Sequence, residues 1–332
     1  LNFKGYAVTY DSVEVAKIKK LNPGLINSLL KNLINNNKKI NKKEVDQQII
    51  PYWIKKNLNN NKIKINNFLE TISKEPSLHL VFKNKKSLDI FKEDNIRTTN
   101  TSAFLAKKKR ITEIQDYKKG FWWVQDFASM LPIYLSSEFK SKKIIDLCSA
   151  PGGKAFQNLS LKNEVTLNDI SKKRIKILKN NLDRLKFDTK IINFDALKIS
   201  ENERYDVVIL DAPCSGVGTL RRNPEILFKK NPPNLKKLNE IQNSLINKAA
   251  KLLKEKGILL YMVCSFLSSE TKIIKSSFLK NNKQFSQLKY KIDNKNTLSR
   301  FIDNEGDINC IPSEFNGYMI DGFYAVKFIR ND

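Results

Sequence analysis

Four cysteines are the residues of this sequence whose side chains could act as nucleophiles: Cys148, Cys214, Cys264 and Cys310. They lie far apart, so no CxxC pair is present to hold zinc, and a chain of 332 residues needs no disulfide scaffold. The four thiols are therefore either reactive or simply buried. His79 is the only histidine, which argues against Cys–His and Ser–His–Asp hydrolases and against a multi-histidine metal site. We expect His79 to be structural and the protein to bind no metal.

Short β-rich runs separated by helical or loop segments are the elements that would position these thiols. They lie at residues 144–148, 164–168, 190–194, 206–210 and 258–263. Residues 171–185 have the apolar spacing of a helix capped by Ser171. This alternation of strands and helices predicts a doubly wound α/β sheet from about residue 140 onward. In such sheets ligands bind beyond the carboxyl ends of the strands.

Polar or reactive side chains follow each of the five predicted strands. In chain order these are the 148–154 loop, Asp169, Asp195, Asp211 with Cys214, and Cys264. One acidic residue after a strand is ordinarily a helix cap. The same feature at successive strands that converge on one cleft favours a nucleotide-like cofactor site.

The loop after the first strand is the predicted centre of that site, with Cys148, Ser149, Ala150, Pro151, Gly152, Gly153 and Lys154. Its two glycines allow backbone to approach a ligand closely. The loop matches neither the Walker A nor the G-x-G-x-x-G pattern, so phosphate binding is unsupported. Asp169 is expected to accept the ribose hydroxyls and Asp195 the adenine amine. A nucleoside without phosphates fits S-adenosylmethionine better than NAD or ATP.

The first 120 residues have a different pattern. A helix is predicted at 23–34, then a polar Asn/Lys run, then a strand at 78–82, a short helix at 87–92 and a strand at 98–105. Lys107, Lys108, Lys109 and Arg110 form a basic run that would either line a phosphate track or stand in a solvated loop.

The charge balance favours a polyanionic partner. Lys and Arg outnumber Asp and Glu by 60 to 34, a formal charge of +26, which favours RNA or DNA. A competing explanation is the Lys-, Asn- and Ile-rich bias of an A/T-rich genome. No apolar stretch is long enough to span a membrane and no signal peptide opens the chain, so we expect a cytoplasmic protein with no membrane partner. The chain begins with Leu1, which leaves room for a natural N-terminus upstream.

Four motifs resemble, in the same order, those of the RsmB-type (Fmu/Sun) RNA cytosine-C5 methyltransferases. They are DLCSAPGGK, ND with Arg174 downstream, DAPCSGVGTLRRNPEI and VCSFLSSE. The resemblance runs from about residue 50 to the C-terminus, and the opening segment resembles the last helix of a NusB-like domain. Val263 and Ser149 replace commoner family residues without removing a reactive group.

The resemblance implies an α/β fold whose Rossmann-like class I S-adenosylmethionine methyltransferase sheet occupies residues 131–332. A small α/β RNA-binding subdomain is expected at 45–130, and a helical remnant of a NusB-like domain with a linker at 1–44. The expected cofactor is S-adenosylmethionine, held by the 148–154 loop, Asp169, Arg174, Asp195 and Asp211. The expected partner is RNA, either 16S ribosomal RNA or transfer RNA, and the expected state is monomeric.

The resemblance also implies roles for three residues. Cys264 is the nucleophile that attacks cytosine C6, Cys214 assists product release and Asp211 binds the N3 edge. DNA cytosine methyltransferases instead use a Pro-Cys after the fourth strand, as in Pro213-Cys214, so the sequence alone leaves the order of the two thiols open. The alternative to an enzyme is a noncatalytic RNA-binding protein that assists ribosome assembly. Arg221 and Arg222 are candidate phosphate contacts.

Overall fold

The structure, a computed structural model, describes residues 5–36, 50–60, 65–107, 109–228, 233–293 and 295–332. The chain divides into two compact units. The first comprises the described residues up to Glu75 and a short piece that begins at Leu227, and the second comprises Pro76–Ile226 and the described residues after 232. The three-part domain division drawn from the sequence stays a prediction.

The first unit is helical, with α1 (Gly5–Ile18), α2 (Pro23–Asn35), α4 (Tyr52–Asn60) and α5 (Ile65–Ser73). The predicted helix at 23–34 is confirmed as α2. It begins where the Asn22 side chain accepts a hydrogen bond from Leu25 N at 3.1 Å, with proline at the first helical position. Among the described residues, no helix has the length and apolar character needed to cross a membrane.

The second unit contains an antiparallel four-stranded sheet in the order β2-β3-β1-β4. Its elements are β1 (His79–Phe82), α6 (Lys85–Asp89), β2 (Asn95–Thr99), β3 (Ser102–Leu105), the 3₁₀ turn η2 (Ile111–Glu113) and β4 (Trp122–Val124). The prediction of one strand at 98–105 is wrong, because the chain reverses at residues 100–101. The Ser102 hydroxyl forms hydrogen bonds with the hydroxyls of Thr98 and Thr99, 2.7 and 2.6 Å long, and these hold the reversal together.

The second sheet of this unit has the order β10-β14-β9-β8-β5-β6-β7, with β11 paired to β14. Its strands are β5 (Lys143–Asp146), β6 (Glu164–Asn168), β7 (Lys190–Ile192), β8 (Tyr205–Asp211), β9 (Leu253–Val263), β10 (Phe285–Leu288), β11 (Ile308–Cys310) and β14 (Phe323–Arg330). The five predicted strands are confirmed as β5 to β9, and they run parallel. β10, β11 and β14 are antiparallel additions. A separate ribbon is formed by β12 (Ser313–Phe315) and β13 (Tyr318–Ile320).

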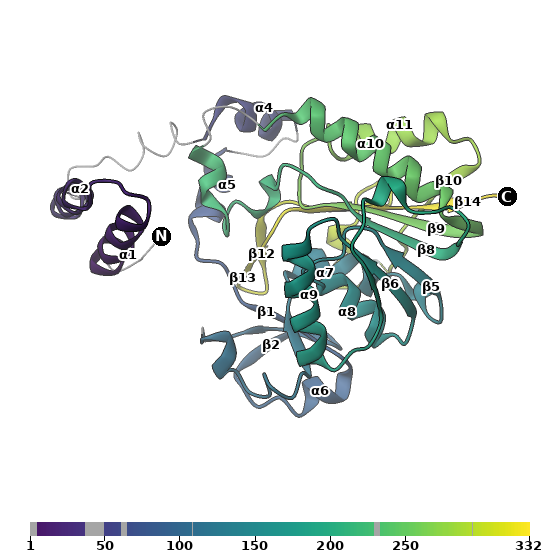
Figure 1. Ribbon diagram of the computed structural model, residues 1–332, viewed down its shortest axis with the longest axis horizontal. Helices are drawn as coiled ribbons and strands as arrows, with labels where there is room; N and C mark the ends of the chain where they lie inside the picture. The colour runs from purple at the N-terminus through teal and green to yellow at the C-terminus, as the bar shows by residue number, and fades with distance from the viewer. Residues whose placement is uncertain (1–4, 37–49, 61–64, 108, 229–232, 294) are drawn as a thin grey trace. The chain divides into compact units, whose positions relative to one another are not determined.

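Helices cover both faces of this sheet (Figure 1), with α7 (Phe127–Tyr134), α8 (Gly153–Ser160) and α9 (Lys172–Leu185) on one face and α10 (Leu235–Lys251) and α11 (Lys272–Asn281) on the other. The sheet has a hydrophobic core on each face: the first core lies under α7, α8 and α9, and the second under α10 and α11. Along β8, Val207 and Ile209 point into the first core, and Val208 and Leu210 point into the second. Burial on both faces explains why the parallel strands read as continuous apolar runs. Short 3₁₀ turns complete the unit: η3 (Ser137–Phe139), η4 (Ala196–Lys198), η5 (Val217–Thr219), η6 (Pro224–Phe228) and η7 (Thr297–Phe301).

One edge of the large sheet collects the carboxyl ends of all five parallel strands. Because β14 is antiparallel to β9, its amino end lies at the same edge, with Tyr324 opposite Val263. Asp321, Gly322 and Phe323 therefore reach the loops that carry the cysteines.

Candidate active site

The predicted cofactor loop lies against the end of β6. Ser149 donates from both its backbone N–H and its hydroxyl to the Asn168 carbonyl oxygen, at 2.8 and 3.0 Å. Gly152 has φ +119°, and a Cβ there would lie 2.1 Å from the Phe156 ring. The turn into α8 therefore requires glycine at this position.

Asp169 and Arg174 tie this loop to the start of α9. The buried Asp169 carboxylate accepts from Ala150 N at 3.3 Å and Ser171 N at 2.9 Å, and it lies 3.3 Å from Arg174 Nη2. Arg174 also donates to the Ala150 carbonyl oxygen. Asp195 caps the short turn η4 through one carboxylate oxygen, at 3.0 Å from Leu197 N. The structure thus brings the predicted loop, Asp169 and Arg174 together, and gives Asp195 a capping role as well.

Two exposed apolar side chains beside these carboxylates were not predicted. Ile170 follows Asp169 and is 67% exposed, and Phe194 precedes Asp195 and is 49% exposed. Apolar surface next to hydrogen-bond acceptors is what a nucleoside needs, because its ring is flat and its sugar carries hydroxyl donors. The carboxylates of Asp169 and Asp195, together with these two apolar side chains, fit the adenosine part of the expected cofactor. Their exposure is a tertiary property that the sequence pattern does not show.

Asp146 ends β5 and Cys148 begins this loop, and neither is suited to be the nucleophile. Burial, followed by the nearby charge of Asp211, raises the pKa of Asp146 to about 7. Burial and then the charge of Asp146 raise the pKa of the Cys148 thiol. Cys148 contributes its backbone N–H, which donates to Asp146 Oδ1 at 3.3 Å. A thiol held in its protonated form is a poor nucleophile.

Cys214 and Cys264 meet at the ends of β8 and β9, with 3.3 Å between their sulfur atoms. Both thiols are free and partly buried. Gly218 allows the loops to come this close: its N–H donates to the Cys264 carbonyl oxygen at 3.0 Å, and a Cβ on it would lie 2.1 Å from the Gly322 carbonyl oxygen. The two thiols are therefore placed to act on one substrate atom.

A single buried carboxylate holds both cysteine loops. Glu270 Oε1 accepts from Ser215 N at 2.8 Å and from Gln242 Nε2 at 3.1 Å. Its Oε2 accepts from the hydroxyls of Ser215 and Ser265, at 2.5 and 2.6 Å. Ser215 and Ser265 directly follow the two cysteines, so Glu270 fixes the backbone on which each thiol stands. Glu270 is not among the residues that the sequence analysis predicts for the site.

The Cys214 thiol holds its proton firmly. The hydrogen bond with Cys264, together with burial, raises the pKa of Cys214 well above that of an ordinary thiol. Cys214 therefore keeps its proton at neutral pH. It is then the donor in the contact with the Cys264 sulfur.

Asp211 and Lys154 form an ion pair beside the thiols. Lys154 Nζ lies 2.7 Å from Asp211 Oδ2 and 5.0 Å from the centre of the Phe323 ring. The Lys154 side chain is only 13% exposed and that of Asp211 is 31% exposed. A largely desolvated ammonium is thus paired with the carboxylate that ends β8.

Arg221 and Arg222 converge on Asp321. Arg221 is buried and lies 2.7 Å from Asp321 Oδ1, so its prediction as a phosphate contact is wrong: a neighbouring carboxylate neutralises it inside the protein. Arg222 donates through Nε to Asp321 Oδ2 at 2.6 Å, and its side chain remains 47% exposed. Burial lowers the pKa of Arg222, but Asp321 and Asp126 outweigh that effect, and Cys264 adds to the net rise. The Arg222 guanidinium is thus within electrostatic range of the Cys264 sulfur.

The remaining histidine and cysteine are buried away from these groups. His79 Nδ1 donates to the Gln125 carbonyl oxygen at 2.8 Å and Nε2 accepts from the Thr98 hydroxyl at 2.9 Å. Burial lowers the pKa of His79 to about 4, so the ring is neutral, as expected of a structural histidine. Cys310 is buried in the first core, and burial raises its pKa.

A family model and similar curated proteins point to the same family. The family model described as 16S rRNA methyltransferase RsmB/F matches residues 133–329. Ribosomal RNA small subunit methyltransferase B of Shewanella oneidensis is 33% identical over 239 residues, which cover 70% of this chain and 53% of that protein. The probable methyltransferase of the same name from Bacillus subtilis is 31% identical over 220 residues, covering 63% and 47%. The chain thus spans about half the length of these curated relatives.

Solved structures agree on the fold. A methyltransferase homologue from Pyrococcus horikoshii has a TM-score of 0.63 at 21% identity and covers 80% of this chain and 90% of its own. NSun6 from the same organism, solved with SFG, has a TM-score of 0.66 at 15% identity, covering 86% and 98%. The predicted Rossmann-like class I methyltransferase sheet is confirmed, and the chain belongs to the RsmB/F family of RNA methyltransferases.

Proposed function

We propose that this chain transfers a methyl group to carbon 5 of a cytosine in small-subunit (16S) ribosomal RNA, through a temporary bond between Cys264 Sγ and cytosine C6. The observation that carries the proposal is the pair of free thiols, 3.3 Å apart, at the ligand-binding edge of a methyltransferase sheet. The names of the matched relatives support ribosomal RNA as the substrate.

S-adenosylmethionine is the methyl donor, and when bound it supplies an electrophilic methyl group on a sulfonium. The 148–154 loop, Asp169 and Arg174 bind its nucleoside part, with Asp195 and Asp211 at the neighbouring strand ends. Ile170 and Phe194 offer apolar surface to the adenine ring.

Cys264 activates the base, because cytosine C5 alone is too weak a nucleophile. Its thiolate adds to C6, and the electrons of the C5–C6 double bond then make C5 able to take the methyl group. Arg222 places a positive charge within electrostatic range of this sulfur. Transfer of the C5 proton to water restores the double bond as the bond from C6 to Cys264 breaks and its electrons return to that sulfur.

Cys214 assists the release step. It keeps its proton and donates to the Cys264 sulfur, so it stabilises that sulfur as it leaves the base. Asp211 and Lys154 bind the N3 edge of the ring, where Lys154 offsets the negative charge that develops during attack.

Cys214→Ala and Cys264→Ala test the order of the two thiols. We expect Cys214→Ala to accumulate a covalent RNA adduct, seen as a denaturation-resistant band, because attack proceeds while release is slowed. Cys264→Ala should give neither adduct nor 5-methylcytosine. Cys310→Ala, which removes a core thiol outside both the cofactor loop and the thiol pair, is the matched control and should methylate normally. The reverse pattern would assign the attack to Cys214.

Mapping of 5-methylcytosine in cells with and without the gene tests the substrate. We expect one cytosine of 16S ribosomal RNA to lose its methyl group when the gene is absent. A change confined to transfer RNA would contradict the ribosomal assignment and leave the chemistry standing.

A further inference from the structure

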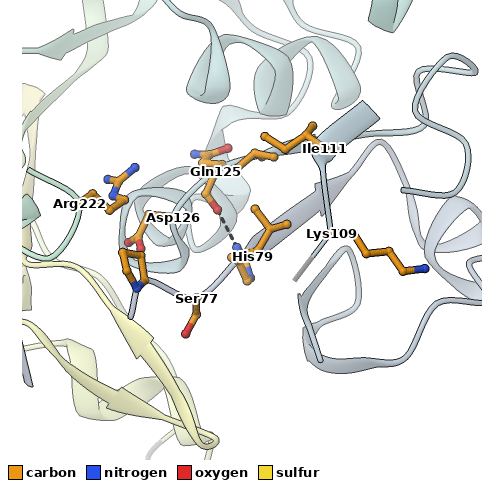
Figure 2. A pocket seen from close by; sticks show the side chains of 10 residues that line it. Ser77, His79, Lys109, Ile111, Gln125, Asp126 and Arg222 are labelled. Atoms are coloured by element: carbon orange, nitrogen blue, oxygen red, sulfur yellow. Dashed lines mark hydrogen bonds between the residues drawn. The ribbon is translucent and has the colours of Figure 1, made fainter. Parts of the chain in front are cut away.

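A pocket of about 310 Å³ lies where β1 begins and β4 ends. Figure 2 shows its lining, with Arg222 and Asp126 at one end, Lys109 at the other and His79 between them. Leu78, Ile111 and Val124 give it apolar walls. Ile111 is 45% exposed and Val124 is 41% exposed, so the pocket presents apolar surface to solvent. Its size and mixed lining are those of a ligand site.

The lining of this pocket is separate from the groups that act on the methylated base. It includes no residue of the cofactor loop and neither Cys214, Cys264 nor Asp211. Arg222 is the link between the two sites, since it lines the pocket and also donates to Asp321. Gly322, the next residue, donates to the Gly218 carbonyl oxygen, and the Gly218 N–H donates to the Cys264 carbonyl oxygen. A base held in the pocket is therefore a different base from the one that Cys264 attacks, and it lies nearby.

We propose that this pocket binds the base of an RNA nucleotide next to the methylated cytosine. The inference rests on the proposed function, because it takes the target to be a cytosine in RNA. A target base must leave its stack to reach Cys264, which also unstacks its neighbours. An apolar pocket beside the reaction centre gives one of these neighbours a new surface to stack on.

The polar groups of the pocket suit a nucleotide. The Ser77 hydroxyl accepts from Met319 N at 2.9 Å and keeps its own proton to donate to a base edge. Among the described residues, Nη1 of Arg222 has no hydrogen-bond partner, while Nε and Nη2 contact Asp321, so Nη1 is available for a phosphate oxygen. Lys109 pairs with Glu93 at the other end, and its side chain is 41% exposed. Two cations at opposite ends of an apolar cavity match a base flanked by backbone phosphates.

Val124→Trp tests the proposal by filling the pocket. Ile96→Trp is the matched control, because Ile96 is equally exposed, at 43%, on β2 of the same sheet but does not line the pocket. We expect Val124→Trp to raise the KM for RNA about tenfold with kcat unchanged, as loss of one stacked base would do. Ile96→Trp should change neither value.

Photocrosslinking gives a second measurement that does not need methylation. A short single-stranded RNA containing 4-thiouridine should crosslink to the tryptic peptide that begins at Ile111 in the wild-type protein and in Ile96→Trp, and lose this crosslink in Val124→Trp. Equal crosslinking by all three proteins, or none at this peptide, would overturn the pocket assignment. If the wild type methylates no RNA but the crosslink behaves as expected, the proposed function fails, and the pocket binds an RNA base that is not the neighbour of a methylated cytosine.

Discussion

Four donors satisfy the Glu270 carboxyl group, and among the described residues no cation forms an ion pair with it. They come from Ser215, which gives two, and from Gln242 and Ser265. A fully buried carboxylate is tolerated only when its lone pairs are used in this way. The cost of removing it is therefore set by the donors left without an acceptor.

Glu270→Ala should lower the free energy of unfolding by about 3 kcal/mol, because it leaves buried donors unpaired on both cysteine loops. The Glu270→Gln variant keeps the shape and one oxygen, so its loss should be smaller. Urea unfolding of the two variants measures this difference. Glu240→Ala, an exposed glutamate on α10, is the control and should unfold as the wild type does. Equal stability of Glu270→Ala and Glu240→Ala would show that the contacts of Glu270 contribute nothing.

The residues that could be predicted are those whose role is set by local sequence. Cys214, Cys264 and Asp211 stand directly after strands, so the pattern of the chain places them. Glu270 and Asp321 act through contacts with residues far away in the sequence, 55 positions from Ser215 and 100 from Arg221. Such pairings form only when the sheet brings the loops together. The same reason made Arg221 resemble a free surface charge.

At the scale of elements, strand β5 ends in a carboxylate whose protonation depends on folding. Asp146 has a pKa near 3.8 when exposed, and burial raises it to about 7 in the folded protein. The folded state therefore binds more protons than the unfolded state between these two values. Stability contributed by this group is present at low pH and lost as pH rises towards 7.

Asp146→Asn should remove that part of the pH dependence. The free energy of unfolding of the wild type should fall between about pH 4 and pH 7, and the variant should show a flatter profile over the same interval. Asp206→Asn is the control: its pKa is lowered by Lys254 despite partial burial, so its replacement should leave this slope in place. Parallel profiles for Asp146→Asn and the wild type would contradict the assignment.

The elements that were not predicted are those with mixed patterns. Each parallel strand contains an uninterrupted apolar or β-branched run that stands out in the sequence, whereas β14 contains Lys327 in the middle of its run. Lys327 is buried and pairs with Glu138, which lies 189 positions earlier, so a charged residue sits inside a core strand. The β2–β3 hairpin was read as one strand because its two-residue turn contains neither glycine nor proline.

At the scale of the whole molecule, a formal charge of +26 has two explanations that differ in their consequences. If it reflects only an A/T-rich genome, the lysines are scattered and individual losses should not matter. If it binds RNA, the basic residues near the reaction edge should release counterions from the nucleic acid on binding. The salt dependence of affinity separates these explanations, because it counts the phosphates that the protein neutralises.

Affinity for single-stranded RNA should fall linearly with salt concentration on a double-logarithmic plot. Lys107 and Arg110 have side chains that are 81% and 85% exposed, with only loose pairing to Asp94 and Glu113 at 3.8 Å, so replacing both with alanine should not disturb the fold. If this run lines the RNA, the double variant should reduce the slope by about 1.4, since each phosphate contact to a single strand contributes about 0.7. Lys251→Ala is the control, because Lys251 ends α10 at the side of the sheet where β9 begins, opposite the cysteines. If the double variant has the same slope as the wild type, Lys107 and Arg110 do not contact RNA phosphates and belong to a solvated loop, which is the alternative interpretation.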